Sequence, residues 1–400
     1  MKNSKFLQTL ALFFYLLLSA GISVSQPVYK KDETVKILQA VSAKLNSIHE
    51  VSYKYSRESL YAGENYHNIY NTTVYIDFTS AGNNTGYHFQ AEDDKYFSCY
   101  NGSQYFFLNK VKKNIVIKQK PGNDVFESLS PLYNSLISLR AIIPMLIQND
   151  SIKKVLTDTV INNENFYRLQ LELYDHYLGN LGDIKNFTSE YIGDKHKPYE
   201  IIINKKTLLP YSYITKFKDR PADFIAARFM DIDTNPKKPG ELSWFYSTYT
   251  AEYEAPKPGK PLVSPSTELK NWTLPSYEPG KVDSISLYQY RGKIVLLDFW
   301  IKTCGPCLAS FPLLNELQQK FGNNEFQLLS INTEDKKEDI AFFYKKHKPV
   351  YKMLFGAERL VEEYGIPSFP TCILLDKSGK VIYAGDFNKD EIEKLVLQHL

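Results

Sequence analysis

The spacing of apolar residues changes several times along the chain, and each change marks a different type of secondary structure. Between residues 32 and 48 the apolar positions recur at helical spacing: Val35, Leu38, Val41, Leu45 and Ile48. Asp32 is suited to cap the start of this helix. From residue 51 to 118 the chain consists of short aromatic runs broken by turn residues, which predict β-strands. Asn101-Gly102, between two such runs, predicts a tight hairpin.

The middle of the chain repeats this combination of helix and strands. Residues 132–148 return to a helical period, with Pro144 expected to kink or end the helix. Strand-like runs then continue to Tyr253, with residues 204–210 as a turn between two of them. The 30 tyrosines and 24 phenylalanines support many strands, because flat side chains pack well on a pleated sheet. The N-terminal region is therefore predicted to be a mainly antiparallel β (α+β) domain with one or two helices.

A proline-rich segment separates this region from a different pattern. Residues 254–280 contain six prolines, which favour an extended, semi-stiff connector. Beyond it, strands predicted at 294–300, 326–332, 371–376 and 381–384 alternate with helices predicted at 307–320, 337–346, 357–364 and 389–400. We therefore expect a β-rich domain over residues 26–253, a linker over 254–267 and an α/β domain over 268–400.

The first 25 residues have the pattern of a secretory signal. Lys2 and Lys5 precede a mainly apolar stretch from Phe6 to Ala20, and small residues follow before Gln26. An uncleaved membrane anchor is the second interpretation, although the apolar stretch is short for a membrane span. Both interpretations place the rest of the chain in the periplasm or another extracytoplasmic compartment, where disulfides persist.

Length and composition narrow the function. A chain of 400 residues favours two domains over one. A formal net charge of +3 gives no electrostatic case for nucleic acid as a partner. Four cysteines are too few for a disulfide-stapled scaffold, and two of them form Cys304-Gly305-Pro306-Cys307. Cysteine is therefore expected to serve chemistry here.

The Cys304–Cys307 pair lies where a predicted buried strand gives way to a helix. Unpaired N–H groups at a helix start favour negative charge, so Cys304 should have a lowered pKa and act as the attacking thiolate. Cys307, one turn further along, should be more buried and should resolve the mixed disulfide. The spacing thus predicts a thiol–disulfide exchange site.

Two other uses of the cysteine pair compete with redox chemistry. A CxxC motif can supply half of a zinc site, but Cys99 and Cys372 are isolated and His347 lies in a lysine-rich stretch. A purely structural disulfide is the other possibility. Redox chemistry is favoured for a strand–CGPC–helix arrangement in an exported chain. We expect no metal and no cofactor beyond the redox-active disulfide.

Both halves of the chain resemble known families. Residues 268–400 resemble the TlpA-like extracytoplasmic thioredoxins, which are thiol–disulfide oxidoreductases. The matching stretches are residues 287–293, residues 295–300, the CGPC motif, residues 364–371 and residues 374–380. Residues 30–250 resemble the LolA-like half-barrels of bacterial envelope proteins in the order of their elements. The first resemblance implies a thioredoxin-like fold, and the second implies a curved antiparallel sheet.

The TlpA-like resemblance implies a substrate-binding surface. Pro370 matches the family's cis-proline, which lies opposite the cysteines and presents backbone to a substrate strand; Pro367 is the competing position. Phe369 and Trp300 are the other residues expected to bind substrate, and Trp300 is expected to shield the cysteine pair.

Asp298 matches the buried acid that lies below the cysteines in this family. A carboxyl group within an apolar strand should have a raised pKa, because burial disfavours its charged form. That pKa suits it to take the proton from Cys307. Asp298 is therefore predicted to be catalytic together with Cys304 and Cys307.

The chain departs from the family pattern at several positions. Thr303 stands where thioredoxins often carry tryptophan, and Ser310 replaces a glutamate found in some cytochrome-maturation members. The absence of that glutamate weakens any case for cytochrome substrates. Cys372 and Cys99 are each expected to be buried apolar residues without a redox role.

We therefore predict an extracytoplasmic thiol–disulfide oxidoreductase that reduces disulfides of exported client proteins and is re-reduced by a membrane thiol electron donor. The Gly-Pro dipeptide favours a reductase over an oxidase. The alternative is a redox-regulated lipid or apolar-ligand binding protein of the cell envelope. A thiol peroxidase is disfavoured because the required threonine-to-cysteine spacing is absent. The membrane itself is a partner only if the N-terminal segment is retained.

Overall fold

The computed structural model describes residues 28–79, 85–187, 195–322 and 325–400. The signal segment predicted for residues 1–25 lies outside this part of the chain. Contacts divide the chain into two compact units, the first ending at Tyr249 and the second beginning at Thr250, with residues 59–69 and 112–116 grouped with the second.

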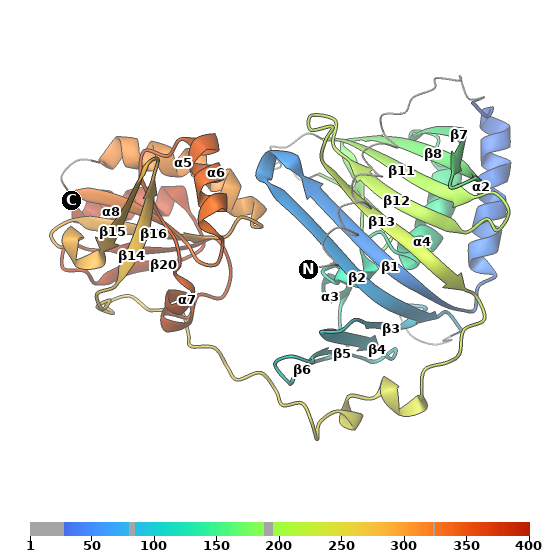
Figure 1. Ribbon diagram of the computed structural model, residues 1–400, viewed down its shortest axis with the longest axis horizontal. Helices are drawn as coiled ribbons and strands as arrows, with labels where there is room; N and C mark the ends of the chain where they lie inside the picture. Colours follow the sequence, from blue (N-terminus) through green and yellow to red (C-terminus); the bar gives the residue numbers. More distant parts are fainter. Residues whose placement is uncertain (1–27, 80–84, 188–194, 323–324) are drawn as a thin grey trace. The chain divides into compact units, whose positions relative to one another are not determined.

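A long curved sheet forms the body of the N-terminal unit (Figure 1). Within the described residues it has 11 strands in the order β6-β5-β4-β3-β2-β1-β13-β12-β11-β8-β7. The strands are β1 (Glu50–Tyr61), β2 (Tyr66–Asp77), β3 (His88–Glu92), β4 (Tyr96–Tyr100), β5 (Gln104–Asn109), β6 (Asn114–Gln119), β7 (Lys153–Ile161), β8 (Glu164–Tyr174), β11 (His196–Asn204), β12 (Pro210–Lys216) and β13 (Phe224–Asp233). The short strands β9 (His176–Leu178) and β10 (Ile184–Asn186) form a separate pair. Neighbouring strands pair antiparallel along the series β2-β3-β4-β5 and along the series β13-β12-β11-β8-β7.

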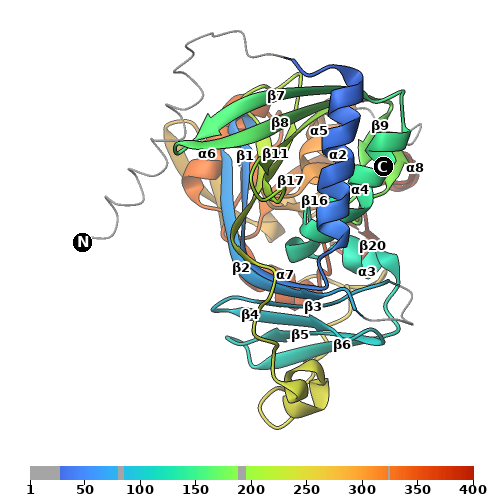
Figure 2. The same ribbon diagram turned by 90° about the vertical axis from the view of Figure 1, so that its right-hand side faces the viewer.

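Two helices cover one face of this sheet (Figures 1 and 2). They are α2 (Lys31–Asn46) and α4 (Leu136–Gln148), and a short helix, α3 (Asn123–Glu127), precedes α4. Three of the apolar positions that predicted the first helix, Leu38, Val41 and Leu45, are buried by α2 against the strands. Aromatic side chains such as Tyr53 and Tyr213 pack into the same core, so the helices and the inner face of the sheet share one continuous cluster.

The sequence predicted this region in outline. Both helices are present, and Asn101-Gly102 joins β4 to β5 as the predicted hairpin. Pro144 lies within α4 and does not end it, since the helix continues to Gln148. The stretch Ser130–Gln148 is long and apolar enough to cross a membrane, but 61% of it is buried inside the protein, which is typical of a core helix.

Residues between Gly240 and Tyr249 lie against the other face of the sheet, where they include the short helices η3 (Glu241–Trp244) and η4 (Tyr246–Thr248). The Trp244 ring packs against Tyr75 with ring centroids 5.9 Å apart. The Trp244 carbonyl oxygen lies 3.9 Å from the Sγ atom of Cys99, which is fully buried. Cys99 is therefore the buried residue that the sequence predicted.

The C-terminal unit has a seven-stranded sheet in the order β15-β14-β18-β17-β16-β19-β20 within the described residues. Its strands are β14 (Thr273–Glu278), β15 (Lys281–Ser286), β16 (Ile294–Trp300), β17 (Phe326–Asn332), β18 (Lys352–Leu354), β19 (Thr371–Leu375) and β20 (Val381–Gly385). Its helices are α5 (Gly305–Phe321), α6 (Lys337–His347), α7 (Glu358–Tyr364) and α8 (Lys389–His399), with the turn η5 (Leu287–Tyr290) after β15. The central strands β16, β17 and β18 are parallel, as the alternation of strands and helices predicted.

The sheet has a separate apolar core on each face. Ile294, Leu296 and Trp300 of β16 share one core with Cys307, whereas Leu297 and Phe299 belong to the other. Because side chains alternate along a strand, Asp298 points to the same face as Cys307. This parity places the acid beneath the helix that carries the cysteines.

Part of the segment predicted as a linker is held by the C-terminal unit. The Val263 N–H donates to the Tyr364 carbonyl at 2.9 Å, and the Ser266 N–H donates to the Val381 carbonyl at 2.8 Å. Leu262 and Val263 pack against the apolar core. Their apolar side chains explain why this stretch is attached although prolines surround it.

The backbone of Gly182 packs closely against α4 in the N-terminal unit. Its φ is +93°, and a Cβ atom there would lie 2.5 Å from Ala141 Cβ and 2.6 Å from the Ser138 carbonyl oxygen. We expect Gly182→Ala to lower the free energy of unfolding by roughly 2 kcal/mol or more, measured by urea unfolding followed by circular dichroism. The control is Gly240→Ala, because Gly240 has a φ of −59° and open space around its Cβ position. Equal stability of the two variants would contradict this.

Candidate active site

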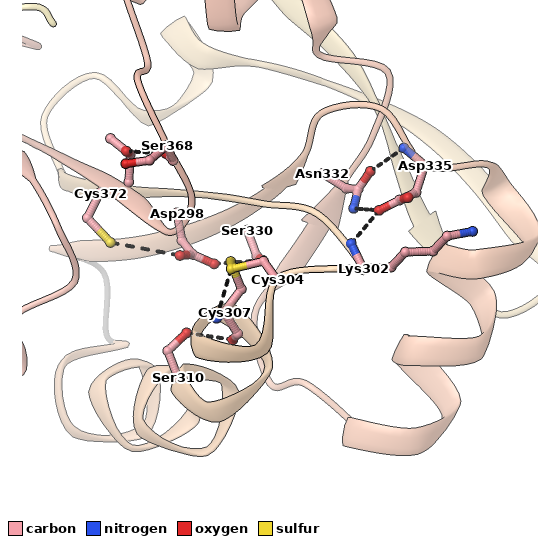
Figure 3. The surroundings of a disulfide bond; sticks show 11 residues. Asp298, Lys302, Cys304, Cys307, Ser310, Ser330, Asn332, Asp335, Ser368 and Cys372 are labelled. Atoms are coloured by element: carbon pink, nitrogen blue, oxygen red, sulfur yellow. Dashed lines mark hydrogen bonds between the residues drawn. A yellow bond between two sulfur atoms is a disulfide. The ribbon is translucent and has the colours of Figure 1, made fainter. Parts of the chain in front are cut away.

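The cysteine pair lies at the start of α5, where Cys304 is the N-cap residue. Its sulfur accepts a hydrogen bond from the Cys307 N–H at 3.1 Å. Pro306 in the first turn suits a helix start, because its missing N–H would have no partner there. The two cysteines form a disulfide with their Cα atoms 5.3 Å apart (Figure 3).

The two sulfurs have different surroundings. Cys304 is half-buried, whereas Cys307 is fully buried in the core between the sheet and α5. When the pair is reduced, a thiolate at Cys304 would lie at the positive end of the helix dipole. The position of Cys304 therefore suits attack, and that of Cys307 suits resolution.

Asp298 lies in the middle of β16 and has no exposed surface. The Ser330 hydroxyl donates to its Oδ2 at 3.1 Å, and the Cys372 thiol donates to its Oδ1 at 3.8 Å (Figure 3). Desolvation raises the pKa of Asp298 to about 7, and the two hydrogen bonds partly oppose that rise. Such a carboxyl group can exchange a proton near neutral pH.

The predicted cis-proline is present. The Phe369–Pro370 peptide bond is cis, and it is the one cis bond within the described residues. Pro367 therefore does not take this role. β19 begins at Thr371, which pairs with Phe299 near the end of β16. The cysteine turn follows the end of β16, so the cis bond and the cysteines lie at the same edge of the sheet. Phe369 and Pro370 are half-buried there.

Trp300 does not occupy the position expected of a substrate-binding residue. It is fully buried, and its ring makes edge contacts with Phe311 at 5.0 Å and Phe343 at 5.4 Å. The residue belongs to the core face of β16, because it has the same parity as Asp298. The expectation that Trp300 contacts substrate is therefore wrong for this structure, and Trp300 supports α5 from below.

A polar clamp that the sequence did not reveal holds the segment between β16 and the cysteines. Asp335 Oδ2 accepts from the Lys302 N–H at 2.6 Å and from Asn332 Nδ2 at 2.7 Å (Figure 3). The Lys302 ammonium group forms an ion pair with Asp339 at 2.7 Å. The polar residues directly after β17 were the available signal, because neighbouring parallel strands end at one edge of a sheet.

Ser310 and Cys372, two further residues that the sequence analysis singled out, both make hydrogen bonds at the site. The Ser310 hydroxyl donates to the Cys307 carbonyl at 2.8 Å and is buried. Cys372 is buried as predicted, but it also donates to Asp298, which a purely apolar residue would not do. Within the described residues no group of three or more His, Cys, Asp or Glu side chains is placed to hold a metal ion.

A central parallel sheet, a helix capped by the first cysteine of CGPC and a cis-proline at the same sheet edge together define a thioredoxin-like domain. Residues 292–381 match the family model described as thioredoxin-like. The domain thus has a thioredoxin-like fold with a redox-type cysteine pair, and the relatives that it resembles are thiol–disulfide oxidoreductases.

Two of the similar relatives carry the same name. A thiol-disulfide oxidoreductase ResA from Geobacillus thermodenitrificans is 32% identical over 117 residues, which cover 28% of this chain and 65% of that protein. A ResA from Bacillus cereus is 28% identical over 153 residues, covering 37% of this chain and 82% of the relative. The first match thus spans slightly less than two thirds of its relative's length.

A solved structure is similar over the same region. The thioredoxin domain of a thiol-disulfide oxidoreductase from Bacteroides vulgatus is 25% identical, with a TM-score of 0.31, and the match covers 34% of this chain and 99% of that domain.

The different exposure of the two cysteines predicts different reactivity. After mild reduction, Cys304 should be alkylated at pH 6 well before Cys307, because Cys304 is accessible and lies at the helix N-terminus. Mass spectrometry of peptides labelled over time measures this. Cys99 and Cys372, both buried, serve as internal controls that should remain unlabelled in the native protein. Equal rates at Cys304 and Cys307 would contradict the assignment.

Burial of Asp298 predicts a pH-dependent cost to stability. The unfolded carboxyl group ionises near pH 3.8, whereas the folded group keeps its proton until about pH 7. The stability that this group contributes at low pH is therefore lost as the pH rises through that window. Relative to the wild type, Asp298→Asn should gain up to about 4 kcal/mol in free energy of unfolding between pH 4 and pH 8. Urea unfolding at each pH measures the gain, and parallel pH curves would refute it.

Proposed function

We propose that this protein is an extracytoplasmic thiol–disulfide oxidoreductase that reduces disulfides of exported client proteins. The observation that carries the proposal is the CGPC pair at the start of α5, with Cys304 accessible and Cys307 buried on the face of the sheet that holds Asp298. This arrangement supplies an attacking thiolate, a resolving thiol and a proton acceptor in one place.

The reaction proceeds in two exchanges. The Cys304 thiolate attacks one sulfur of the client disulfide, forms a mixed disulfide and releases the first client thiolate. Cys307 then gives its proton to the Asp298 carboxylate and attacks the Cys304 sulfur. This breaks the mixed disulfide, releases the second client thiolate and leaves the Cys304–Cys307 disulfide. Two electrons pass from the dithiol to the client.

The proposed substrate surface lies beside the cysteine turn, at the start of β19. The backbone around Phe369–Pro370 lies at the sheet edge from which the cysteine turn emerges. Phe369 and Pro370 are half-buried, so part of each is available to a client segment. We assign the contact with the client to this edge and to Cys304. Trp300 acts only by supporting α5.

The compartment and the partners follow from the N-terminal sequence and the chemistry. Residues 1–25 carry the features of an export signal or an anchor, and client disulfides persist outside the cytoplasm. A disulfide left on the enzyme must be reduced for the next cycle, so a membrane protein that delivers thiol electrons is the proposed donor. The Gly-Pro dipeptide between the cysteines supports the reducing direction, and the relatives named thiol-disulfide oxidoreductase support the exchange chemistry itself.

The alternative function, binding of a lipid or another apolar ligand, has less support. The inner face of the N-terminal sheet packs against α2 and α4 in one cluster of buried side chains. Apolar residues that a ligand would contact are therefore already in contact with the helices. We propose that this unit serves as a surface for client or partner proteins.

Loss of the resolving thiol should trap clients. Full-length Cys307→Ser, expressed in its native host, should accumulate disulfide-linked adducts through Cys304, because attack survives and resolution is lost. Non-reducing gels followed by mass spectrometry identify the adducts. The double variant Cys304→Ser/Cys307→Ser is the matched control and should form none. Absence of adducts from exported Cys307→Ser would count against reduction of protein disulfides.

A further inference from the structure

The buried acid of the active site has a hydrogen-bond donor on each of its two oxygens. Ser330 Oγ lies 3.1 Å from Asp298 Oδ2, and Cys372 Sγ lies 3.8 Å from Asp298 Oδ1. None of the three side chains has exposed surface. No water can replace either donor from outside without a rearrangement of the core.

Strand pairing places these donors. Asp298 pairs with Ser330 across the parallel β16–β17 ladder and with Cys372 across the antiparallel β16–β19 ladder. The three residues therefore form one row across the sheet, on the face that also carries Cys307. The register of each strand thus decides that these three side chains lie on one face and next to one another.

We propose that Cys372 is a positioning residue for the resolving step, which holds the Asp298 carboxyl group and helps to set the pH range in which that group accepts the proton of Cys307. The proposal rests on the proposed function, since it assigns a part in that reaction. It gives Cys372 a role as a hydrogen-bond donor and no role in electron transfer.

The chemistry of a buried thiol supports this role. Burial and the neighbouring Asp298 carboxyl group raise the pKa of Cys372 well above its usual range, so the thiol keeps its proton and remains a donor. A thiol is a weak donor, but a hydrogen bond to an ionised acceptor is stronger than one to a neutral acceptor. The bond therefore favours the ionised form of Asp298, which is the form that can take a proton.

The other titratable groups around this row are few. Tyr351, which precedes β18, faces Asp298 and is buried. Asp386 and Tyr383 interact with Cys372 from the end of β20 and the loop after it. Cys307 faces the row from α5. None of these groups is a cation, so the ionised form of Asp298 depends on hydrogen bonds from Ser330 and Cys372.

Cys99 provides the natural comparison. It is also fully buried in a strand, yet its sulfur lies near a backbone carbonyl oxygen, that of Trp244 at 3.9 Å. In the part of the chain that the structure describes, the acceptor for this thiol is that carbonyl oxygen and not a carboxyl group. The two free cysteines thus have the same burial and different partners, which makes Cys99→Ala a matched control for Cys372→Ala.

The test separates the two exchanges with oxidised glutathione as the disulfide. Pre-reduced full-length protein releases one glutathione when Cys304 attacks and a second when Cys307 resolves the mixed disulfide. Both releases are timed between pH 5 and pH 9 in the wild type and in Cys372→Ala, Cys372→Ser, Ser330→Ala and Cys99→Ala. The carbon-13 NMR signal of the Asp298 carboxyl group is titrated in the same proteins, as a readout independent of activity.

Loss of the Cys372 donor should move the midpoint of the second release and of the carboxyl titration to higher pH by roughly half a unit to one unit. Below the midpoint the second release should then be about three- to tenfold slower, while the first release is unchanged. Ser330→Ala should shift the midpoint in the same direction. Cys372→Ser, whose hydroxyl can still donate, should restore the wild-type midpoint, and Cys99→Ala should leave it unmoved.

An unchanged carboxyl midpoint in Cys372→Ala would overturn the proposal. If Cys372→Ala does not fold, Cys372→Ser decides the question. A shifted carboxyl midpoint in that variant would also overturn the proposal, because its hydroxyl group can still donate. Failure of the wild type to release any glutathione would refute the proposed function instead. In that case the carboxyl titration would still decide whether Cys372 sets the ionisation of Asp298.

Discussion

A carboxyl group in the middle of the central strand of a sheet, without exposed surface, limits what can surround it. Its charged form is costly in an apolar core unless donors reach it, and its neutral form is the one that burial favours. Asp298 is balanced between these forms because β17 and β19 each contribute one donor. Both strands must keep their register for this, since a slip of one residue would turn Ser330 or Cys372 to the opposite face. The ionisation of the active-site acid therefore depends on the correct pairing of all three strands.

The sequence predicted the local parts of this site well. CGPC at a strand-to-helix junction, an acid two residues before the end of an apolar strand, and the Phe369–Pro370 pair are all features of short stretches of chain. The strand Phe326–Asn332 was predicted to the residue, because its apolar run is flanked by clear turn signals. A cis bond is common only before proline, so Phe369–Pro370 could be expected from the family resemblance.

What the sequence could not show depends on contacts between distant residues. Ser330 and Cys372 lie 32 and 74 positions from Asp298, and only the strand register brings them together. Trp300 was assigned to the substrate surface, whereas its parity along β16 turns it into the core. β14 was missed because Pro275 and its proline-rich surroundings suggested a connector, and β18 because it has only three residues. In the N-terminal unit, the aromatic runs predicted strands but gave no order for an 11-stranded sheet.

The attachment of residues 262–268 has a consequence for the solubility of the C-terminal unit. β20 is the last strand of its sheet, and such an edge offers unpaired N–H and C=O groups to any passing strand. Here Ser266 and Thr267 bond to both backbone groups of Val381, and Glu268 pairs with Lys380, so the chain that enters the domain covers the start of this edge. The segment that resembles a tether in the sequence thus also protects the domain against edge-to-edge aggregation. A domain separated from its neighbour beyond residue 268 would lose that protection, whereas one that retains Leu262 would keep it.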